Sequence, residues 1–203
     1  YINKRSIRSI NSNQFVFYDY LAGLWEGDGH LWIPKNSHAP SGKKYHPQVD
    51  ITFGEKEYPL VLKLKSLIGD TIRHKKNNNA YVLTLSSFGD LDRFIKLVNG
   101  RLRTPKIIKF LDLINWKNNN YYSESLTCIS EPFDTNLLSN SWLAGFIDAN
   151  GSFDIRINPT RVRFRLEQRK EFLNKSYEPI MKQISQEFNL NLSLSKHNFK
   201  SYF

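Results

Sequence analysis

Two stretches of the chain carry the same pattern of apolar and polar positions. They read YLAGLWEGDGHLWI at residues 20–33 and WLAGFIDANGSFDI at residues 142–155, and they align without a gap. In the first stretch Leu21, Leu24 and Trp25 are spaced i, i+3, i+4, which predicts a helix with one apolar stripe. The offset of 122 positions (143 − 21) is far longer than the period of a solenoid repeat. The pattern therefore predicts a duplicated domain.

A strand pattern and then a helix pattern follow the first stretch. Val49, Ile51 and Phe53 alternate with polar residues, as in a strand with one buried face. Two more strands are expected near 71–75 and 81–86, and two more helices around 91–98 and 107–116. The first helix pattern beyond the strand has apolar residues at Leu60, Leu64, Leu67 and Ile68.

The second stretch is followed by the same order of elements. A strand pattern contains Val162, Phe164 and Leu166 alternating with arginines, and a helix pattern contains Ile180, Ile184 and Phe188. The match with the first copy ends at about its residue Leu83. We therefore expect the second half to be incomplete and the chain to be a truncated or partly observed version of a longer protein.

The region between the two copies lacks sustained periodicity. Residues 118–139 are rich in Asn and Ser and are predicted to form a linker. This divides the chain into a first half at 1–117 and a second half at 140–203.

Composition favours a folded protein with a polyanionic partner. The chain has 29 Lys and Arg against 19 Asp and Glu, a formal charge of +10, and 28 aromatic residues (14 Phe, 10 Tyr and 4 Trp). Excess positive charge favours nucleic acid as the partner, the alternative being a soluble basic protein with no such role. Cys128 is the only cysteine, which excludes an internal disulfide and a cysteine-based metal site. The apolar runs are too short to span a membrane.

The repeated stretches combine features that suit a close helix pair. Small residues stand side by side in each copy, Ala22 with Gly23 and Ala144 with Gly145, and small residues let two helix backbones approach closely. Two such helices are expected to pack against each other at a pseudo-twofold axis.

The end of each predicted helix is acidic. Gly29 and Gly151 are natural helix stops, so Asp28 lies near a helix C-terminus, where the macrodipole disfavours an anion. Paired acidic ends are better explained by a bound cation than by stability, and Mg²⁺ prefers such oxygen-rich sites. The alternative is that Asp-Gly and Asn-Gly are ordinary turn dipeptides.

The two motifs, Leu21–Gly29 (LAGLWEGDG) and Leu143–Gly151 (LAGFIDANG), resemble those of the LAGLIDADG homing endonucleases of the single-chain, two-motif kind. The resemblance implies an α+β fold of two αββαββα halves related by pseudo-twofold symmetry, with the motif helices packed together at the centre. It implies antiparallel, saddle-shaped sheets over double-stranded DNA, a target of roughly 20 base pairs or about two helical turns, and a monomeric protein. Such proteins are typically encoded in introns, often of organelles, which points to a mitochondrial or other organelle matrix.

The resemblance also implies roles for particular residues. The last acid of each motif binds divalent metal, and these positions are Asp28 and Asn150; the carbonyls of Gly27 and Ala149 commonly join them. The chemistry implied is phosphodiester hydrolysis by metal-activated water, with Mg²⁺ as the cofactor and Mn²⁺ or Ca²⁺ able to occupy the site. Glu26 and Asp148 match an acid that is not usually a ligand, and we interpret them as structural.

A basic residue near the site often assists catalysis in proteins of this kind. We expect Lys106 to take that role, with Arg103 and Lys109 as alternatives, and a plain surface lysine as the competing interpretation. Asn150 fits the turn at the helix end but lacks the negative charge that holds a catalytic cation. Cleavage of at least one strand is therefore expected to be impaired.

Strand parity predicts a polar face that reads DNA. An antiparallel ribbon fits the major groove, where Arg, Gln and Asp recognise base edges. Lys43, Lys44 and Lys76 are expected to contact phosphates, whereas the competing interpretation of any single charge is a solvated face. The predicted DNA-binding residues are Trp32, Gln48, Asp50, Thr52, Arg73, Lys75, Asp154, Arg156, Asn158, Arg161, Arg163 and Arg165.

Three functions remain open from sequence. The first is a site-specific double-stranded DNA endonuclease, impaired at its second motif. The second is an intron RNA maturase or a non-cleaving nucleic-acid-binding derivative. The third is a structural component of a ribonucleoprotein, which the acid at Asp28 disfavours.

Overall fold

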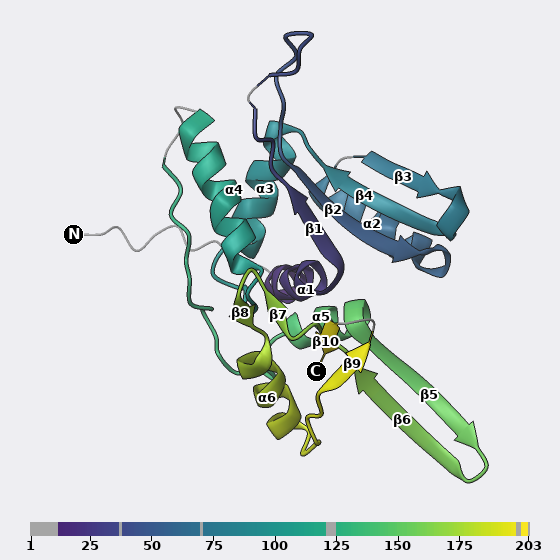
Figure 1. Cartoon of the computed structure of the whole chain (residues 1–203). Coiled ribbons are helices and arrows are strands. Elements are labelled where there is room, and N and C mark those ends of the chain that lie inside the picture. The colour runs from purple at the N-terminus through teal and green to yellow at the C-terminus, as the bar shows by residue number, and fades with distance from the viewer. Residues whose placement is uncertain (1–11, 37, 70, 121–124, 198–199, 203) are drawn as a thin grey trace.

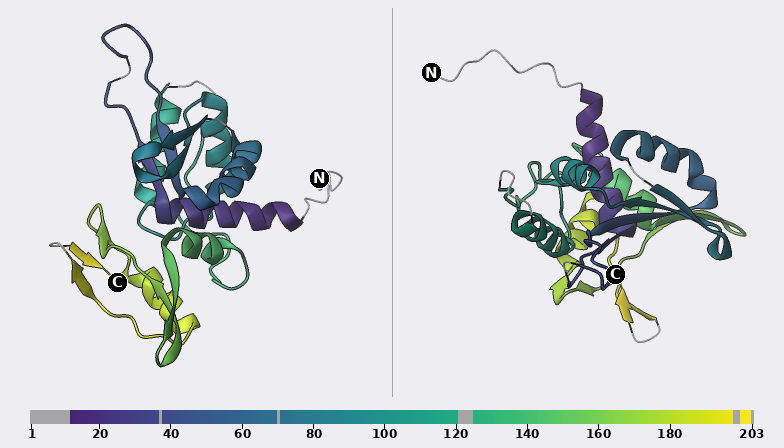
Figure 2. Two further views of the ribbon diagram at one scale, coloured as in Figure 1. Left: turned by 90° about the vertical axis from the view of Figure 1, so that its right-hand side faces the viewer. Right: turned by 90° about the horizontal axis from the view of Figure 1, so that it is seen from above.

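Two helices form the centre of the molecule. The computed structural model describes residues 12–203 apart from 37, 70, 121–124, 198–199 and 203. Helix α1 (Ser12–Asp28) runs beside α5 (Trp142–Asn150), with the first half of the chain on one side of the pair and the second half on the other (Figure 2). Each helix ends one residue before the final glycine of its motif, and a strand begins at that glycine, Gly29 or Gly151.

The first half is a four-stranded antiparallel sheet covered by helices (Figure 1). The strand order is β1-β2-β4-β3, and β3 and β4 confirm the two strands that the sequence predicts near 71–75 and 81–86. Its elements are β1 (Gly29–Trp32), β2 (Gln48–Gly54), α2 (Tyr58–Ile68), β3 (Thr71–Lys75), β4 (Ala80–Leu85), α3 (Phe88–Val98) and α4 (Ile107–Asn120), with short 3₁₀ turns at Glu55–Glu57 and Lys76–Asn78.

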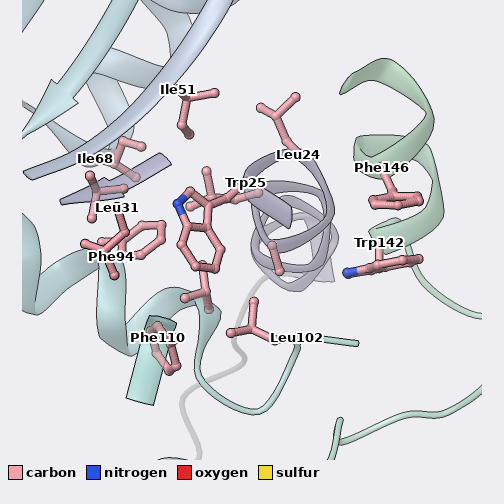
Figure 3. Close-up of a cluster of buried hydrophobic side chains, with 14 of the residues drawn as sticks. Leu24, Trp25, Leu31, Ile51, Ile68, Phe94, Leu102, Phe110, Trp142 and Phe146 are labelled. Carbon is pink, nitrogen blue, oxygen red and sulfur yellow. The ribbon is translucent and has the colours of Figure 1, made fainter. Parts of the chain in front are cut away.

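The core of this half is built around Trp25 (Figure 3). The Trp25 side chain is 1% exposed and meets the rings of Phe94 and Phe110 edge-on, at centroid distances of 5.4 and 6.4 Å. On α2 the buried stripe is Val61, Leu64 and Ile68. The prediction that Leu67 belongs to that stripe is wrong, since the residue is 41% exposed on the outer side of the helix.

The second half repeats the order of elements but not the closed sheet. Within the described residues, β5 (Gly151–Ile157) pairs only with β6 (Thr160–Leu166) in an antiparallel ribbon that projects from the molecule. A short hairpin and a helix follow, and then a separate strand pair. These elements are β7 (Glu171–Phe172), β8 (Lys175–Ser176), α6 (Glu178–Glu187), β9 (Ser195–His197) and β10 (Lys200–Tyr202).

The apolar face of this ribbon is half-buried only at its base, where Phe164 and Leu166 lie, and it is exposed towards the turn. Phe153, Ile155, Ile157 and Val162 are between 70% and 87% exposed. The equivalent face of the first half, with Val49 and Ile51, is buried because the strands pair with β4 and pack under helices. Among the residues that the structure describes, no third strand or helix covers the outer part of the ribbon.

The prediction of a linker from residue 118 is wrong for residues 118–120, which are the last turn of α4. Residues 125–139 contain no helix or strand, but they are anchored to the first half. Leu137 is 1% exposed, and the Phe133 amide donates to the Gly100 carbonyl at 2.8 Å. The Arg103 guanidinium donates to the carbonyls of Thr135 and Asp134. The segment therefore fixes the start of α5 against the first half.

Candidate active site at the ends of the motif helices

The two motif helices touch through their glycines. A Cβ atom added to Gly23 would lie 1.9 Å from the Trp142 carbonyl oxygen, and one added to Gly145 would lie 2.0 Å from the Tyr20 carbonyl oxygen. These distances are far below van der Waals contact, so only glycine permits this backbone approach. The close packing predicted from the small residues is confirmed, and it brings the acidic ends of both helices together.

The C-terminal ends meet at Gly27 and Ala149. A Cβ on Gly27 would lie 2.1 Å from the Ala149 Cβ and 3.0 Å from Asn150 Nδ2. Asp28, the last residue of α1, is exposed, whereas Asn150 is half-buried. Three of the four residues predicted to hold metal therefore lie in contact, and the fourth follows Gly27 directly.

Glu26 has a structural role, as predicted. Its side chain is 0% exposed, and its carboxylate accepts hydrogen bonds from the Arg103 and Thr104 amides, from the Thr104 hydroxyl and from Trp142 Nε1. Burial raises the pKa of Glu26, and the hydrogen bonds from Thr104 and Arg103 oppose that rise. Asp148, at the equivalent position, is exposed and accepts from the Tyr20 hydroxyl at 2.8 Å.

Lys106 closes the C-terminal end of α1. Its ammonium donates to the carbonyls of Trp25, Gly27 and Gly29 at 3.0, 2.7 and 2.8 Å, and the residue is 6% exposed. Burial lowers its pKa to about 8. The residue that sequence singled out as a basic catalytic group is therefore fixed beside Asp28, with one hydrogen bond to a carbonyl that was expected to bind metal.

The alternatives to Lys106 are placed differently. Arg103 is occupied by the linker carbonyls and stacks on the Trp142 ring, with its Cζ 5.4 Å from the centroid, so it braces the helix pair. Lys109 is half-buried on α4, and its ammonium lies 3.4 Å from Asp112 Oδ2. Of the three, Lys106 is the residue whose side chain forms hydrogen bonds with the first motif, whereas Arg103 contacts Glu26 through its backbone amide.

The donor set at the first motif fits a divalent cation. Asp28 provides an exposed carboxylate, and the Gly27 carbonyl, which already accepts from Lys106 Nζ, has a second lone pair to offer. Both are oxygen ligands of the kind that Mg²⁺ prefers. Desolvation raises the pKa of the Asp28 carboxyl, and the Lys106 ammonium opposes the rise. Within the described residues, no cluster of three or more His, Cys, Asp or Glu side chains could hold a metal, so carbonyls and water must complete such a site.

The second motif fits a cation less well. Asn150 Nδ2 is buried and has no hydrogen-bond partner among the residues that the structure describes. An amide offers a cation only a neutral oxygen, and here its NH₂ group lies beside Gly27. A carboxylate at this position would supply the missing charge.

The predicted DNA-reading residues share one face in each half. Register places Arg161, Arg163 and Arg165 opposite Arg156, Asp154 and Ser152. Asp154 accepts from Arg163 Nε at 3.0 Å and Arg165 Nη2 at 2.7 Å, and these hydrogen bonds lower the pKa of its carboxyl. In the first half Trp32 lies opposite Gln48, and Asp50 and Thr52 share their face with Arg73 and Lys75. All six residues are exposed except Asp50, which is half-buried. In the second half, Asn158 is exposed in the turn between β5 and β6.

Several residues of the site were missed by sequence reasoning. Thr104 and Trp142 bind Glu26 from 78 and 116 positions away, and Tyr20 binds Asp148 from 128. No periodicity connects residues so far apart. The duplication does place Tyr20 and Trp142 at the same motif position, which is the one signal that could have paired them.

A central pair of motif helices flanked by two αβ halves defines a duplicated, two-motif protein, and the sequence model described as LAGLIDADG endonuclease matches residues 21–117 and 143–203. The chain belongs to the LAGLIDADG endonuclease family. Its α+β fold is that of the family's solved structures.

The curated relatives are intron-encoded proteins. The chain is 32% identical over 88% of its length to the intron-encoded DNA endonuclease aI3 of Saccharomyces cerevisiae, covering 49% of that protein. It is 32% identical over 80% of its length to a cox1 intron-2 protein of Schizosaccharomyces pombe, and the match covers 49% of that protein. It is 24% identical over 75% of its length to the intron-encoded RNA maturase bI4 of Saccharomyces cerevisiae, and this match covers 22% of the maturase. The chain thus spans about half the length of the first two.

Solved structures share the fold at low sequence identity. LAGLIDADG meganuclease I-AabMI bound to uncleaved DNA matches with a TM-score of 0.61 at 17% identity, over 91% of this chain and 77% of that one. I-SmaMI bound to an uncleaved DNA target in the presence of calcium ions matches with a TM-score of 0.59 at 16% identity, also over 91% and 77%. In the described part of this chain, no helix is both long and apolar enough to cross a membrane.

Proposed function

We propose that this chain is a site-specific, metal-dependent endonuclease for double-stranded DNA whose first motif is competent and whose second motif is impaired. The observation that carries the proposal is the contact between Gly27 and the Ala149–Asn150 end, which joins one motif end with a carboxylate and one without. The relatives and the +10 charge support DNA as the substrate.

Asp28 and the carbonyl of Gly27 would hold a divalent cation, Mg²⁺ by preference with Mn²⁺ or Ca²⁺ as substitutes, and Asn150 and the Ala149 carbonyl would offer weaker oxygens. When bound, the cation supplies an activated water and neutralises charge at the phosphate. Lys106 holds the end of α1 rigid and adds positive charge beside the attacked phosphodiester. The ribbon arginines and the first-half residues around Gln48 orient the duplex.

Cleavage of DNA tests the proposal directly. A target is selected from a randomised duplex pool and cloned into a supercoiled plasmid, which is then treated with the chain in Mg²⁺ or in EDTA. We expect Mg²⁺-dependent nicking that Asp28→Asn abolishes while the variant still binds the duplex. Nicking that persists unchanged in Asp28→Asn would contradict the assignment of Asp28.

A second function is favoured by one comparison. The similarity to an RNA maturase supports binding of intron RNA by the same basic faces. Tight binding to the RNA of its own intron, with no cleavage of any selected duplex, would favour this function over the first. The names of the intron-encoded relatives, one from a cox1 intron, support action in the mitochondrial matrix.

A further inference from the structure

A pocket with three basic residues lies between the two halves, beside the first motif. Gly29 and His30 of β1 line it together with Lys106 and Lys109 of the first half and Arg169 and Phe172 of the second. Among the described residues that line the pocket, none is acidic. An anion is the ligand that such a lining selects.

Arg169 enters this pocket from the other half of the molecule. Its own amide donates to the Oε1 atom of the buried Gln168 at 3.0 Å, which fixes the backbone where the chain leaves β6. Its guanidinium lies over the Phe172 ring, with Cζ 5.4 Å from the centroid. A guanidinium held against an aromatic face keeps its N–H groups directed outward for a ligand.

The donors that an anion would meet come from Arg169 and from Lys109, whose ammonium also lies 3.4 Å from Asp112 Oδ2. The Lys106 ammonium already gives its three hydrogens to the carbonyls of Trp25, Gly27 and Gly29, so it contributes charge without a spare donor. The Arg169 guanidinium is exposed and offers the planar fork that matches phosphate oxygens.

The equivalent position in the first half carries no charge. Gly29 pairs with Ile51, and Gly151 pairs with Leu166, so Ile51 and Leu166 correspond. Three residues further along, Arg169 corresponds to Gly54. The second half thus places a cation in the pocket beside Asp28, whereas the corresponding residue of the first half, Gly54, is uncharged.

The geometry points to Arg169, with Lys109 and the charge of Lys106, as a binding site for a backbone phosphate of the DNA strand that passes the first motif. This inference rests on the proposed function and adds to it a residue supplied across the pseudo-twofold axis. It also makes the two sites unequal for a reason independent of Asn150.

The test compares Arg169→Gln with Lys170→Gln. Lys170 is adjacent, loses the same charge on substitution and is not among the described residues that line the pocket; its ammonium lies 3.8 Å from Glu171 Oε1 in an exposed pair. Binding is measured in EDTA on the selected duplex and on duplexes with a neutral methylphosphonate at each linkage in turn. Thermal unfolding of both variants checks that they are folded.

We expect Arg169→Gln to bind the unmodified duplex about tenfold more weakly than the wild-type chain does. The slope of log K against log [salt] should be smaller in magnitude by about 0.9 for the variant. One or two methylphosphonate positions should weaken the wild-type chain and have no further effect on Arg169→Gln. The inference is overturned if Arg169→Gln and Lys170→Gln behave alike, or if every methylphosphonate effect persists in Arg169→Gln. Failure of the proposed function is a different result, since the wild-type chain would then bind no selected duplex.

Discussion

Trp142 of the second motif helix donates its indole N–H to the buried Glu26 of the first at 2.6 Å. Tyr20 stands where Trp142 stands in the other motif, and its hydroxyl donates to Asp148, the counterpart of Glu26. Each helix therefore presents an aromatic donor to the acid of its partner. The first of these bonds is buried and also connected to Thr104, whereas the second faces solvent.

This difference predicts unequal stability effects. Trp142→Phe should lower the free energy of unfolding by about 1.5–3 kcal/mol, because it removes one donor from a buried carboxylate. Tyr20→Phe should cost less than about 1 kcal/mol, because water replaces the lost donor at Asp148. Urea unfolding of both variants measures the two losses in the free energy of unfolding. Equal losses would show that the burial of Glu26 does not determine the cost of removing its donor.

Gly23→Ala should prevent the helix pair from forming. The new methyl would lie 1.9 Å from the Trp142 carbonyl, a backbone atom that cannot rotate away, so we expect a loss of about 3 kcal/mol or more, seen as an insoluble or unfolded product. Gly89→Ala on α3 is the control. Among the described residues, no atom beyond the helix's own backbone and the neighbouring residues lies within 4 Å of the added Cβ, so the stability of this variant should stay within about 0.5 kcal/mol of wild type.

Lys106→Met should destabilise the end of α1. Three carbonyls lose a charged donor in a buried site, for which we expect about 2–4 kcal/mol in urea unfolding. Lys109→Met removes the same charge from a partly exposed pair with Asp112 and should cost less than about 1 kcal/mol. A similar small loss in both variants would argue against the capping role of Lys106.

Asn150→Asp should restore cutting at the second motif. With Mg²⁺ and the selected plasmid, the wild-type chain is expected to accumulate nicked circles, and the variant is expected to yield linear DNA at a higher proportion. The physical reason is the added negative charge at a buried amide that lacks a partner. The same ratio of nicked to linear product in both proteins would refute the impairment.

The pair between Asp92 and Lys117 predicts a dependence on pH. Desolvation acts to raise the pKa of Asp92, but the ammonium groups of Lys117 and Lys96 outweigh it and lower the pKa. A lowered pKa in the folded state gives stability that is present above the unfolded value of about 3.9 and is lost as pH falls through the folded value. Asp92→Asn should therefore cost about 1–3 kcal/mol at pH 7, because the side chain of Lys117 is only 6% exposed.

Unfolding curves at several pH values supply the check. The difference between the wild-type chain and Asp92→Asn should shrink steadily below about pH 4. A difference that stays constant down to pH 2 would mean that the carboxylate charge is not its source.

Local patterns predicted much of the fold because they report local physics. The duplicated motif identified two helices and the reason for their contact, and strand parity placed Arg161, Arg163 and Arg165 on one polar face. The prediction failed where burial depends on distant elements. Leu67 fits a helical stripe but faces outward, and Phe153 alternates like a core residue yet lies in solvent.

The site shows the same division. The contact between the two motif ends could be predicted from the motif alone. The contacts of Glu26 with Thr104 and Trp142, in contrast, join segments with no shared pattern. The role proposed for Arg169 could not be predicted from sequence either. It depends on the pocket that this second-half residue shares with Lys106 and Lys109 of the first half.

The β5–β6 ribbon makes this chain an amphiphile in solution. One side of it carries arginines and the other carries Phe153, Ile155 and Ile157. At low ionic strength the net charge of +10 keeps copies apart, but it also attracts stray polyanions during purification. Added salt releases the polyanions and screens the repulsion at the same time, which leaves the exposed apolar side to bring copies together. Ionic strength therefore acts in opposite directions on purity and on colloidal stability.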